Sequence, residues 1–158
     1  MEKSGVPFSD LMLNISKEIQ IKAPVETVFE SLIEQMGPGM THPDGSPMDL
    51  KFEPWPGGRW FRDLGNNTGH FWGHVQVIKP PTLLEITGPM FMSFPAINHV
   101  QYRLTAEGKI TRLKFMHRAM GPIPDEIREN VGRGWDYGLN RIGEIASRRM
   151  ADRRKESK

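Results

Sequence analysis

The sequence contains no cysteine in its 158 residues. This absence excludes a disulfide framework, a thiolate-bound zinc ion, an iron–sulfur cluster and a catalytic thiol. Long hydrophobic runs are also absent, and none approaches the roughly 18 residues that a membrane-spanning helix requires. Residues 1–10 lack the basic and then apolar pattern of a secretory leader, so we expect a cytoplasmic protein without a membrane span.

Neither sign of charge dominates the chain. It has 21 lysines and arginines against 19 acidic residues, which gives a net charge of +2 at pH 7. Basic residues are concentrated in 148–158, where cations suit the negative end of a helix dipole. A nucleic-acid-binding domain usually presents a broad basic face, so we expect no nucleic-acid partner.

The remaining composition is that of a globular domain. Hydrophobic residues make up 37% of the chain and charged residues 25%. A chain of this length buries roughly two thirds of its unfolded surface, which is enough for one core. No repeat or linker divides it. We therefore expect a single domain over 1–158, with a core at 13–150 and peripheral segments at 1–12 and 151–158.

Strand patterns dominate the middle of the chain, and helical patterns flank them. Alternating apolar residues predict a strand over 13–22, and apolar spacings of three and four predict a helix over 25–36. Residues 37–47 are rich in proline and glycine and are expected to form a loop. Further strands are predicted at 50–52, 59–64, 69–79, 83–87, 99–105 and 110–119. This order predicts an α+β fold.

The last predicted element is a long helix that begins near Pro124. Its apolar stripe comprises Ile127, Val131, Trp135, Leu139, Ile142 and Ile145. Four glycines interrupt the helix, namely Gly132, Gly134, Gly138 and Gly143. Because each costs about 1 kcal/mol relative to alanine, we expect a packing reason, such as close contact with the sheet or room for a bound molecule.

Five segments, in their order and spacing, resemble a known group of proteins. They are IKAPVETVFESL at 21–32, PGGRWF at 56–61, GHVQVIKPPTLLEIT at 73–87, GKITRLKFMH at 108–117 and GWDYGLNRI at 134–142. The chain resembles the START-like, helix-grip superfamily (SRPBCC, polyketide cyclase-like), and within it the branch similar to the activator of heat-shock-protein ATPase homologue. It departs from that pattern at 37–47, where many members place a short helix and a tryptophan-containing segment.

The resemblance implies a fold and leaves several functions open. It implies a START/Bet v-like curved antiparallel sheet of six to seven strands wrapped around a long C-terminal helix, with a hollow between them. Proteins with this fold include lipid carriers, hormone receptors, cyclases and co-chaperones, so the fold alone does not identify the function.

The histidines give weak indications of chemistry. His70 and His74 share a strand face opposite Phe71 and are expected to face solvent; no metal-binding spacing is present, so we expect no metal or cofactor. His117 shares the inward parity of Phe115. A buried histidine usually satisfies its own hydrogen bonds, but His117 is also a candidate to orient a ligand or to act as a general acid or base.

Aromatic residues and methionines are abundant at inward positions and in loops. Such side chains form either a packed core or the wall of a cavity for a hydrophobic ligand. We favour the cavity, with the loops at 37–47 and 88–95 at its mouth and His117 or Tyr102 as the polar contact. The predicted ligand-binding residues are Phe52, Trp60, Phe71, Met90, Phe94, Tyr102, Phe115, His117, Trp135 and Leu139. A bulge at Gly73 would change which residues face inward.

Three functions remain as hypotheses. The leading one is non-covalent binding of a small hydrophobic molecule. The second is a co-chaperone-like interaction domain with a filled core, whose outer surface contacts a protein partner or a second copy of the chain in a homodimer. The third is a cyclase- or hydrolase-like enzyme acting on a bound hydrophobic substrate. His117 would then be its catalytic residue, and His117→Ala would remove turnover while leaving binding largely intact.

Overall fold

The computed structural model describes residue 5 and residues 7–158. Residues 1–4 and 6, part of the predicted peripheral segment and of the stretch inspected for a leader, lie outside the described residues. In chain order the elements are the 3-10 helix η1 (Phe8–Leu11), β1 (Met12–Ile21), α1 (Val25–Met36), β2 (Leu50–Phe52), β3 (Arg59–Gly65), β4 (Thr68–Lys79), β5 (Leu83–Gly88), β6 (Ile97–Glu107), β7 (Ile110–Met120) and α2 (Asp125–Glu156).

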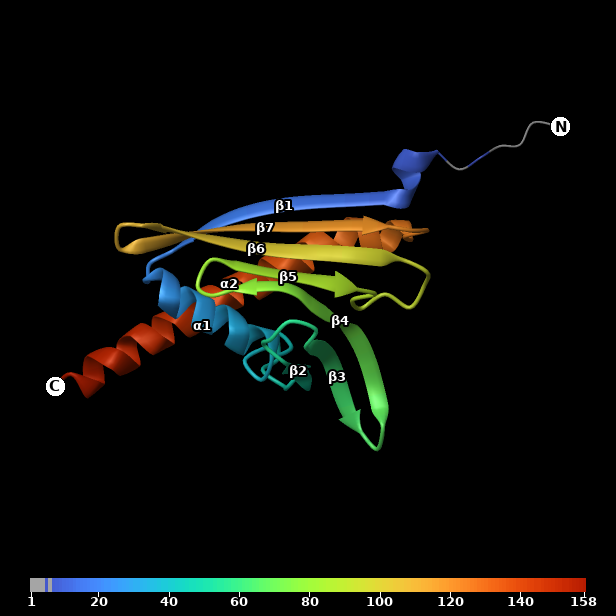
Figure 1. Cartoon of the computed structure of the whole chain (residues 1–158). Coiled ribbons are helices and arrows are strands. Elements are labelled where there is room, and N and C mark those ends of the chain that lie inside the picture. The colour runs from blue at the N-terminus through green and yellow to red at the C-terminus, as the bar shows by residue number, and fades with distance from the viewer. Residues whose placement is uncertain (1–4, 6) are drawn as a thin grey trace.

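The strands form one 7-stranded antiparallel sheet in the order β1-β7-β6-β5-β4-β3-β2. Figure 1 shows α2 running across the sheet, with α1 against it and β2 and β3 at the far end from β1. The predicted α+β, helix-grip architecture is confirmed. Within the part of the chain that the structure describes, no helix is long and apolar enough to cross a membrane.

The bounds of α1 follow from its sequence. Val28, Leu32 and Met36 recur at a spacing of four and are fully buried against the sheet. Gly39 follows the last turn, and its backbone N–H donates to the carbonyl oxygen of Glu34 at 2.9 Å. A Cβ on Gly39 would lie only 2.8 Å from that oxygen, so the turn requires glycine. The predicted helix is confirmed with the same bounds.

The C-terminal helix extends beyond residue 150, where the core was predicted to end. α2 continues to Glu156, through most of the segment expected to be peripheral, and residues 151–158 are exposed. Ion pairs hold α2 over α1: Arg149 contacts Glu30 at 3.0 Å and Glu34 at 3.2 Å. The two helices are therefore joined by charged contacts at one end and by apolar packing elsewhere.

A register shift in β4 changes which residues face the core. Trp60 pairs with Gly73 and Phe61 pairs with Phe71, so Trp72 is an extra residue in β4. Trp72 is buried, with 7% of its surface exposed, whereas Phe71 is 39% exposed. The predicted inward orientation of Phe71 is therefore wrong. The bulge lies next to Gly73, where the sequence indicated one, and it reverses the alternation of side chains.

Two glycines let β4 and β5 approach closely beside this bulge. A Cβ on Gly73 would lie 2.8 Å from the carbonyl oxygen of Thr87, and a Cβ on Gly88 would lie 2.4 Å from the Cα of Gly73. Any side chain at either position would force the strands apart. The glycine pair thus maintains the strand geometry that turns Trp72 toward the helices.

Candidate functional site

A cavity of about 430 Å³ lies between the two helices and the β2–β4 end of the sheet. Its size is within the usual range for small-molecule sites. Most of the side chains in its wall are apolar, and none is acidic. They are Gln35, Met40, Met48, Leu50, Trp60, Arg62, Trp72, Phe91, Ile127, Asn130, Val131, Gly134, Trp135 and Gly138.

Aromatic rings form a continuous part of this wall. Trp60 and Trp72 meet edge to face with centroids 4.8 Å apart, and Trp72 meets Phe91 at 5.8 Å. Trp135 of α2 reaches Phe91 from the other side, at 6.1 Å. Trp60 is also held by its Nε1, which donates to the carbonyl oxygen of Met36 at 2.7 Å. Rings constrained in this way form a wall that exists before any ligand arrives.

Two of the glycines of α2 lie in the cavity wall. Gly138 faces α1, since a Cβ there would lie 3.1 Å from the Nε2 of Gln35. A Cβ on Gly134 would meet no atom within 4 Å. Gly138 therefore permits close packing against α1, where the sequence suggested contact with the sheet, and Gly134 leaves space in the cavity.

Polar groups in the wall are few, and several lack partners. Arg62 is half-buried and donates from Nε to the carbonyl oxygen of Met48 at 3.0 Å. No carboxylate oxygen of the described residues lies within 4.0 Å of its guanidinium nitrogens. The Nε1 of Trp72 and the Oε1 of Gln35 are buried, and among the described residues neither has a hydrogen-bond partner. An unpaired buried group costs roughly 1–3 kcal/mol, so these positions favour a polar partner.

His117 lies behind the cavity wall and is fully buried. The Nε1 of Trp135 donates to the Nδ1 of His117 at 2.9 Å, which places the ring proton on Nε2. That Nε2 in turn donates to the Oδ1 of Asn98 at 2.7 Å. Burial lowers the pKa of His117 to about 4, so the ring is neutral at neutral pH. Both ring nitrogens have protein partners, as expected of a buried histidine that satisfies its own hydrogen bonds.

The structure separates the predicted ligand-binding residues into three groups. Trp60 and Trp135 line the cavity. Phe52 and Phe71 lie at a different, outer groove. The others, apart from the half-buried Phe94, are core residues: Met90, Tyr102, Phe115, His117 and Leu139. Tyr102 packs on Phe115 with centroids 5.1 Å apart, and burial raises the pKa of its phenol. A role in ligand binding remains a prediction for all ten.

Sequence patterns pointed only indirectly to the other wall residues. Met40 lies in the loop expected at the mouth, and Val131 belongs to the apolar stripe of the last helix. Arg62 lies two residues after Trp60 in β3, so the alternation of side chains along a strand is enough to place both on the same face. Trp72 had no such signal, because its inward position depends on the bulge. The wall residues not predicted as ligand-binding are Gln35, Met40, Met48, Leu50, Arg62, Trp72, Phe91, Ile127, Asn130, Val131, Gly134 and Gly138.

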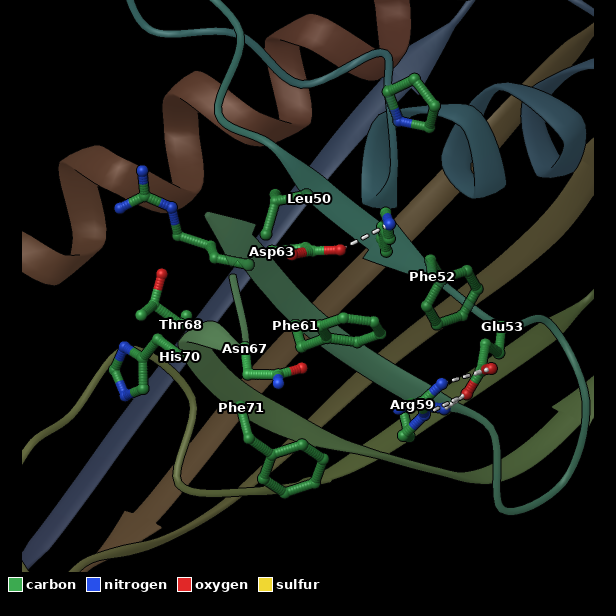
Figure 2. Close-up of a pocket in the computed structure, with 14 residues that line it drawn as sticks. Leu50, Phe52, Glu53, Arg59, Phe61, Asp63, Asn67, Thr68, His70 and Phe71 are labelled. Atoms are coloured by element: carbon green, nitrogen blue, oxygen red, sulfur yellow. Dashed lines mark hydrogen bonds and ion pairs between the residues drawn. The ribbon is translucent and has the colours of Figure 1, made fainter. Parts of the chain in front are cut away.

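The outer groove, of about 810 Å³, follows β2, β3 and β4 and is charged (Figure 2). Arg59 forms two hydrogen bonds with Glu53, at 2.8 and 3.1 Å, and these hold the pKa of Glu53 at about 2. Phe61 and Phe71 project from paired positions of β3 and β4, and the Arg59 guanidinium lies 4.7 Å from the Phe61 ring centroid. No group of three or more metal-ligating side chains occurs in residue 5 or residues 7–158.

Several solved structures share this architecture. CalU16 from Micromonospora echinospora superposes with a TM-score of 0.60 at 24% identity, covering 90% of this chain and 82% of that chain. Protein MLL2253 from Mesorhizobium loti gives 0.65 at 18% identity, covering 85% and 97%. An uncharacterised protein from Rhizobium leguminosarum gives 0.65 at 17%, covering 87% and 95%. These likenesses establish a common fold. No curated protein sequence matches the chain.

A family model identifies the branch within that fold. It matches residues 22–147, which include all of α1, most of α2 and six complete strands from β2 to β7. The resemblance inferred from the five sequence segments is thereby confirmed. The chain belongs to the family described as Activator of Hsp90 ATPase homolog 1-like protein.

Proposed function

We propose that the protein binds a small hydrophobic molecule, without covalent chemistry, in the cavity between α1, α2 and β2–β4. The observation that carries this proposal is the wall itself: three tryptophans, two methionines and Phe91 surround about 430 Å³ of space. Burying an apolar molecule there removes its surface and that of the wall from water, at about 25 cal/mol per Å².

In this proposal the polar contact with the ligand differs from His117 or Tyr102, the residues predicted from the sequence. Both nitrogens of His117 are engaged by Asn98 and Trp135, so the residue stabilises the wall from behind. Arg62, Trp72 and Gln35 carry the polar groups that remain without full partners in the wall. The loops at 37–47 and 88–95 supply Met40 and Phe91, which supports their predicted place at the mouth.

Native mass spectrometry of gently purified protein, followed by extraction of any bound molecule, tests the proposal. We expect a co-purifying hydrophobic compound near one per chain, or a rise in melting temperature with a panel of hydrophobic compounds. An apo mass together with no thermal shift across the panel would overturn it.

Tryptophan fluorescence provides an independent readout. Three of the 4 tryptophans line the cavity, and Trp55 is 54% exposed. A Trp55→Phe background therefore reports almost entirely on the cavity. We expect ligand binding to shift or quench this emission.

A co-chaperone-like contact with a protein partner is the second candidate. It is favoured by exposed apolar side chains in the β2–β4 region, where Trp55 is 54%, Leu64 55% and Phe71 39% exposed. The family description names an activator of the Hsp90 ATPase. The test is the ATPase rate of purified Hsp90 with wild-type protein and with a Trp55→Ser, Phe71→Ser variant. Stimulation that the double variant loses would support this candidate.

The enzyme hypothesis has less support in the geometry. A general acid or base needs a ring nitrogen free to exchange a proton with substrate, and His117 has none. No carboxylate lines the cavity wall. Turnover that His117→Ala abolishes would nevertheless overturn the purely non-covalent proposal.

A further inference from the structure

We propose that the molecule bound in the cavity carries a carboxylate and that Arg62 holds it. This inference rests on the proposed function, because it names the chemical class of the cavity's ligand. Arg62 is the single charged residue in the wall described above. A cation beside an apolar wall favours an anionic partner more strongly than a cation in water does.

Arg62 differs in its partners from Arg59 and Arg149, which are both paired with carboxylates. Arg59, on the same strand, is paired with Glu53 by two hydrogen bonds, and Arg149 is paired with two carboxylates of α1. Arg62 contributes only its Nε, to the carbonyl oxygen of Met48 at 3.0 Å. Its terminal nitrogens have no protein acceptor in the described chain, and a guanidinium fork matches the two oxygens of a carboxylate.

Other N–H donors lie in the same wall. Arg62 pairs with His70 across the β3–β4 ladder, and Trp72 follows two residues later, so both side chains come from one corner of the sheet. The buried Nε1 of Trp72 has no acceptor among the described residues. The Nε2 of Gln35 donates one of its two N–H groups to the sulfur of Met40 at 3.4 Å, a weak acceptor.

The cavity wall therefore offers hydrogen-bond donors and contains no acidic side chain. The amide of Gln35 presents either oxygen or nitrogen after a rotation of its terminal group, so it accommodates an anion as well. A ligand with a cationic head would instead meet Arg62 with like charge and find no carboxylate to pair with.

The volume limits the body of the ligand. At about 30 Å³ for each water-sized group, 430 Å³ holds roughly fourteen non-hydrogen atoms. The inferred class is thus a medium-chain or bicyclic carboxylic acid.

The test compares decanoate, decanol and decylamine, which share one chain and differ in the head group. Binding is followed below the micellar range by the tryptophan emission of the Trp55→Phe protein. We expect decanoate to bind roughly tenfold or more tightly than decanol, and decylamine to bind most weakly.

Variants then assign the preference to one residue. Arg62→Met keeps the aliphatic length and is expected to weaken decanoate roughly ten- to a hundredfold while leaving decanol unchanged. Arg62→Lys keeps the charge and is expected to retain part of the preference. Arg59→Met is the matched control, because Arg59 lies on the same strand and lines the outer groove alone, whereas Arg62 lines both that groove and the cavity. It should change neither affinity.

The outcomes separate this inference from the proposed function. Equal binding of decanoate and decanol to the wild-type protein, or an Arg62→Met variant that retains the preference, would overturn the carboxylate inference and leave the hydrophobic-binding proposal standing. Binding of none of the three would overturn both. The head-group comparison on wild-type protein decides the question even if Arg62→Met fails to fold.

Discussion

The indole Nε1 of Trp135 donates a hydrogen bond to the Nδ1 of His117 at 2.9 Å. This bond links a residue of the cavity wall to a buried polar pair, His117 and Asn98, on the adjacent strands β7 and β6. It requires a neutral imidazole, because a protonated Nδ1 cannot accept. The orientation of one cavity residue is therefore coupled to the protonation state of another residue behind it.

The first prediction concerns pH. The pKa of His117 falls from 6.5 to about 4 on folding, so the unfolded chain binds a proton that the folded protein does not. The contribution of His117 to stability is then constant well above pH 6.5 and falls by roughly 2–3 kcal/mol as the pH drops through 6.5 to about 4.5. Urea unfolding at a series of pH values measures the loss.

The matched variant for this experiment is His117→Gln, which cannot titrate. Its overall stability will be lower, but its decline between the same two pH values should be much shallower than that of the wild type. Parallel pH profiles of the two proteins would show that another group causes the decline.

The second prediction uses two glycines of α2. Gly134 lies in the cavity wall and Gly143 does not, and a Cβ at either meets nothing within 4 Å. Each change to alanine should stabilise the helix by up to about 1 kcal/mol. Only Gly134→Ala should also weaken ligand binding, because its methyl group occupies cavity space. Melting temperature and ligand affinity, measured on both variants, separate the two effects; an equal affinity would place the ligand elsewhere.

The third prediction concerns the contact between Gly73 and Gly88. A Cβ on Gly88 would lie 2.4 Å from the Cα of Gly73 and 2.5 Å from the carbonyl oxygen of Trp72. Gly88→Ala should therefore destabilise the protein by roughly 1–3 kcal/mol and change the emission of Trp72. Denaturant unfolding and fluorescence check both effects. A loss below about 0.5 kcal/mol would mean that the strands separate at little cost.

The fourth prediction compares two tryptophans. Trp60 is 2% exposed and its Nε1 bonds the carbonyl oxygen of Met36, whereas Trp55 is 54% exposed. Trp60→Phe should cost roughly 1–3 kcal/mol, through the lost bond and the gap left by the smaller ring. Trp55→Phe should change stability by less than about 0.5 kcal/mol. Similar unfolding midpoints for the two variants would contradict the anchoring role of Trp60.

The fold was largely predictable because most of its signals are local. The α1 helix follows from apolar spacing between a proline and a glycine-rich turn, and β6 and β7 follow from strict alternation around Glu107–Gly108. The position of Phe71 was not predictable in this way. One extra residue in β4 inverts the faces, and its position depends on contact with β5 through Gly73 and Gly88.

The cavity was predictable in kind but not in position. Alternation assigns Tyr102, Phe115 and His117 to the inner face, and they do lie there, but tertiary packing covers them completely. The open space lies instead beside the loop that carries Met40. Which part of the inner face of the sheet stays unfilled depends on where α2 crosses the sheet. No local sequence pattern determines the position of that crossing.

The pairing of β1 with β7 also determines how late in synthesis the sheet can be completed. β1 is the first strand of the chain and β7 the last, and they pair from Met12–Met120 to Ile21–Thr111. During synthesis β1 has no neighbour in the sheet until all the other strands have emerged, and α2 follows later still. Contacts this distant in sequence slow folding, because the chain must close a large loop first. A ribosome-bound chain therefore exposes the apolar wall of its cavity until the final helix is released.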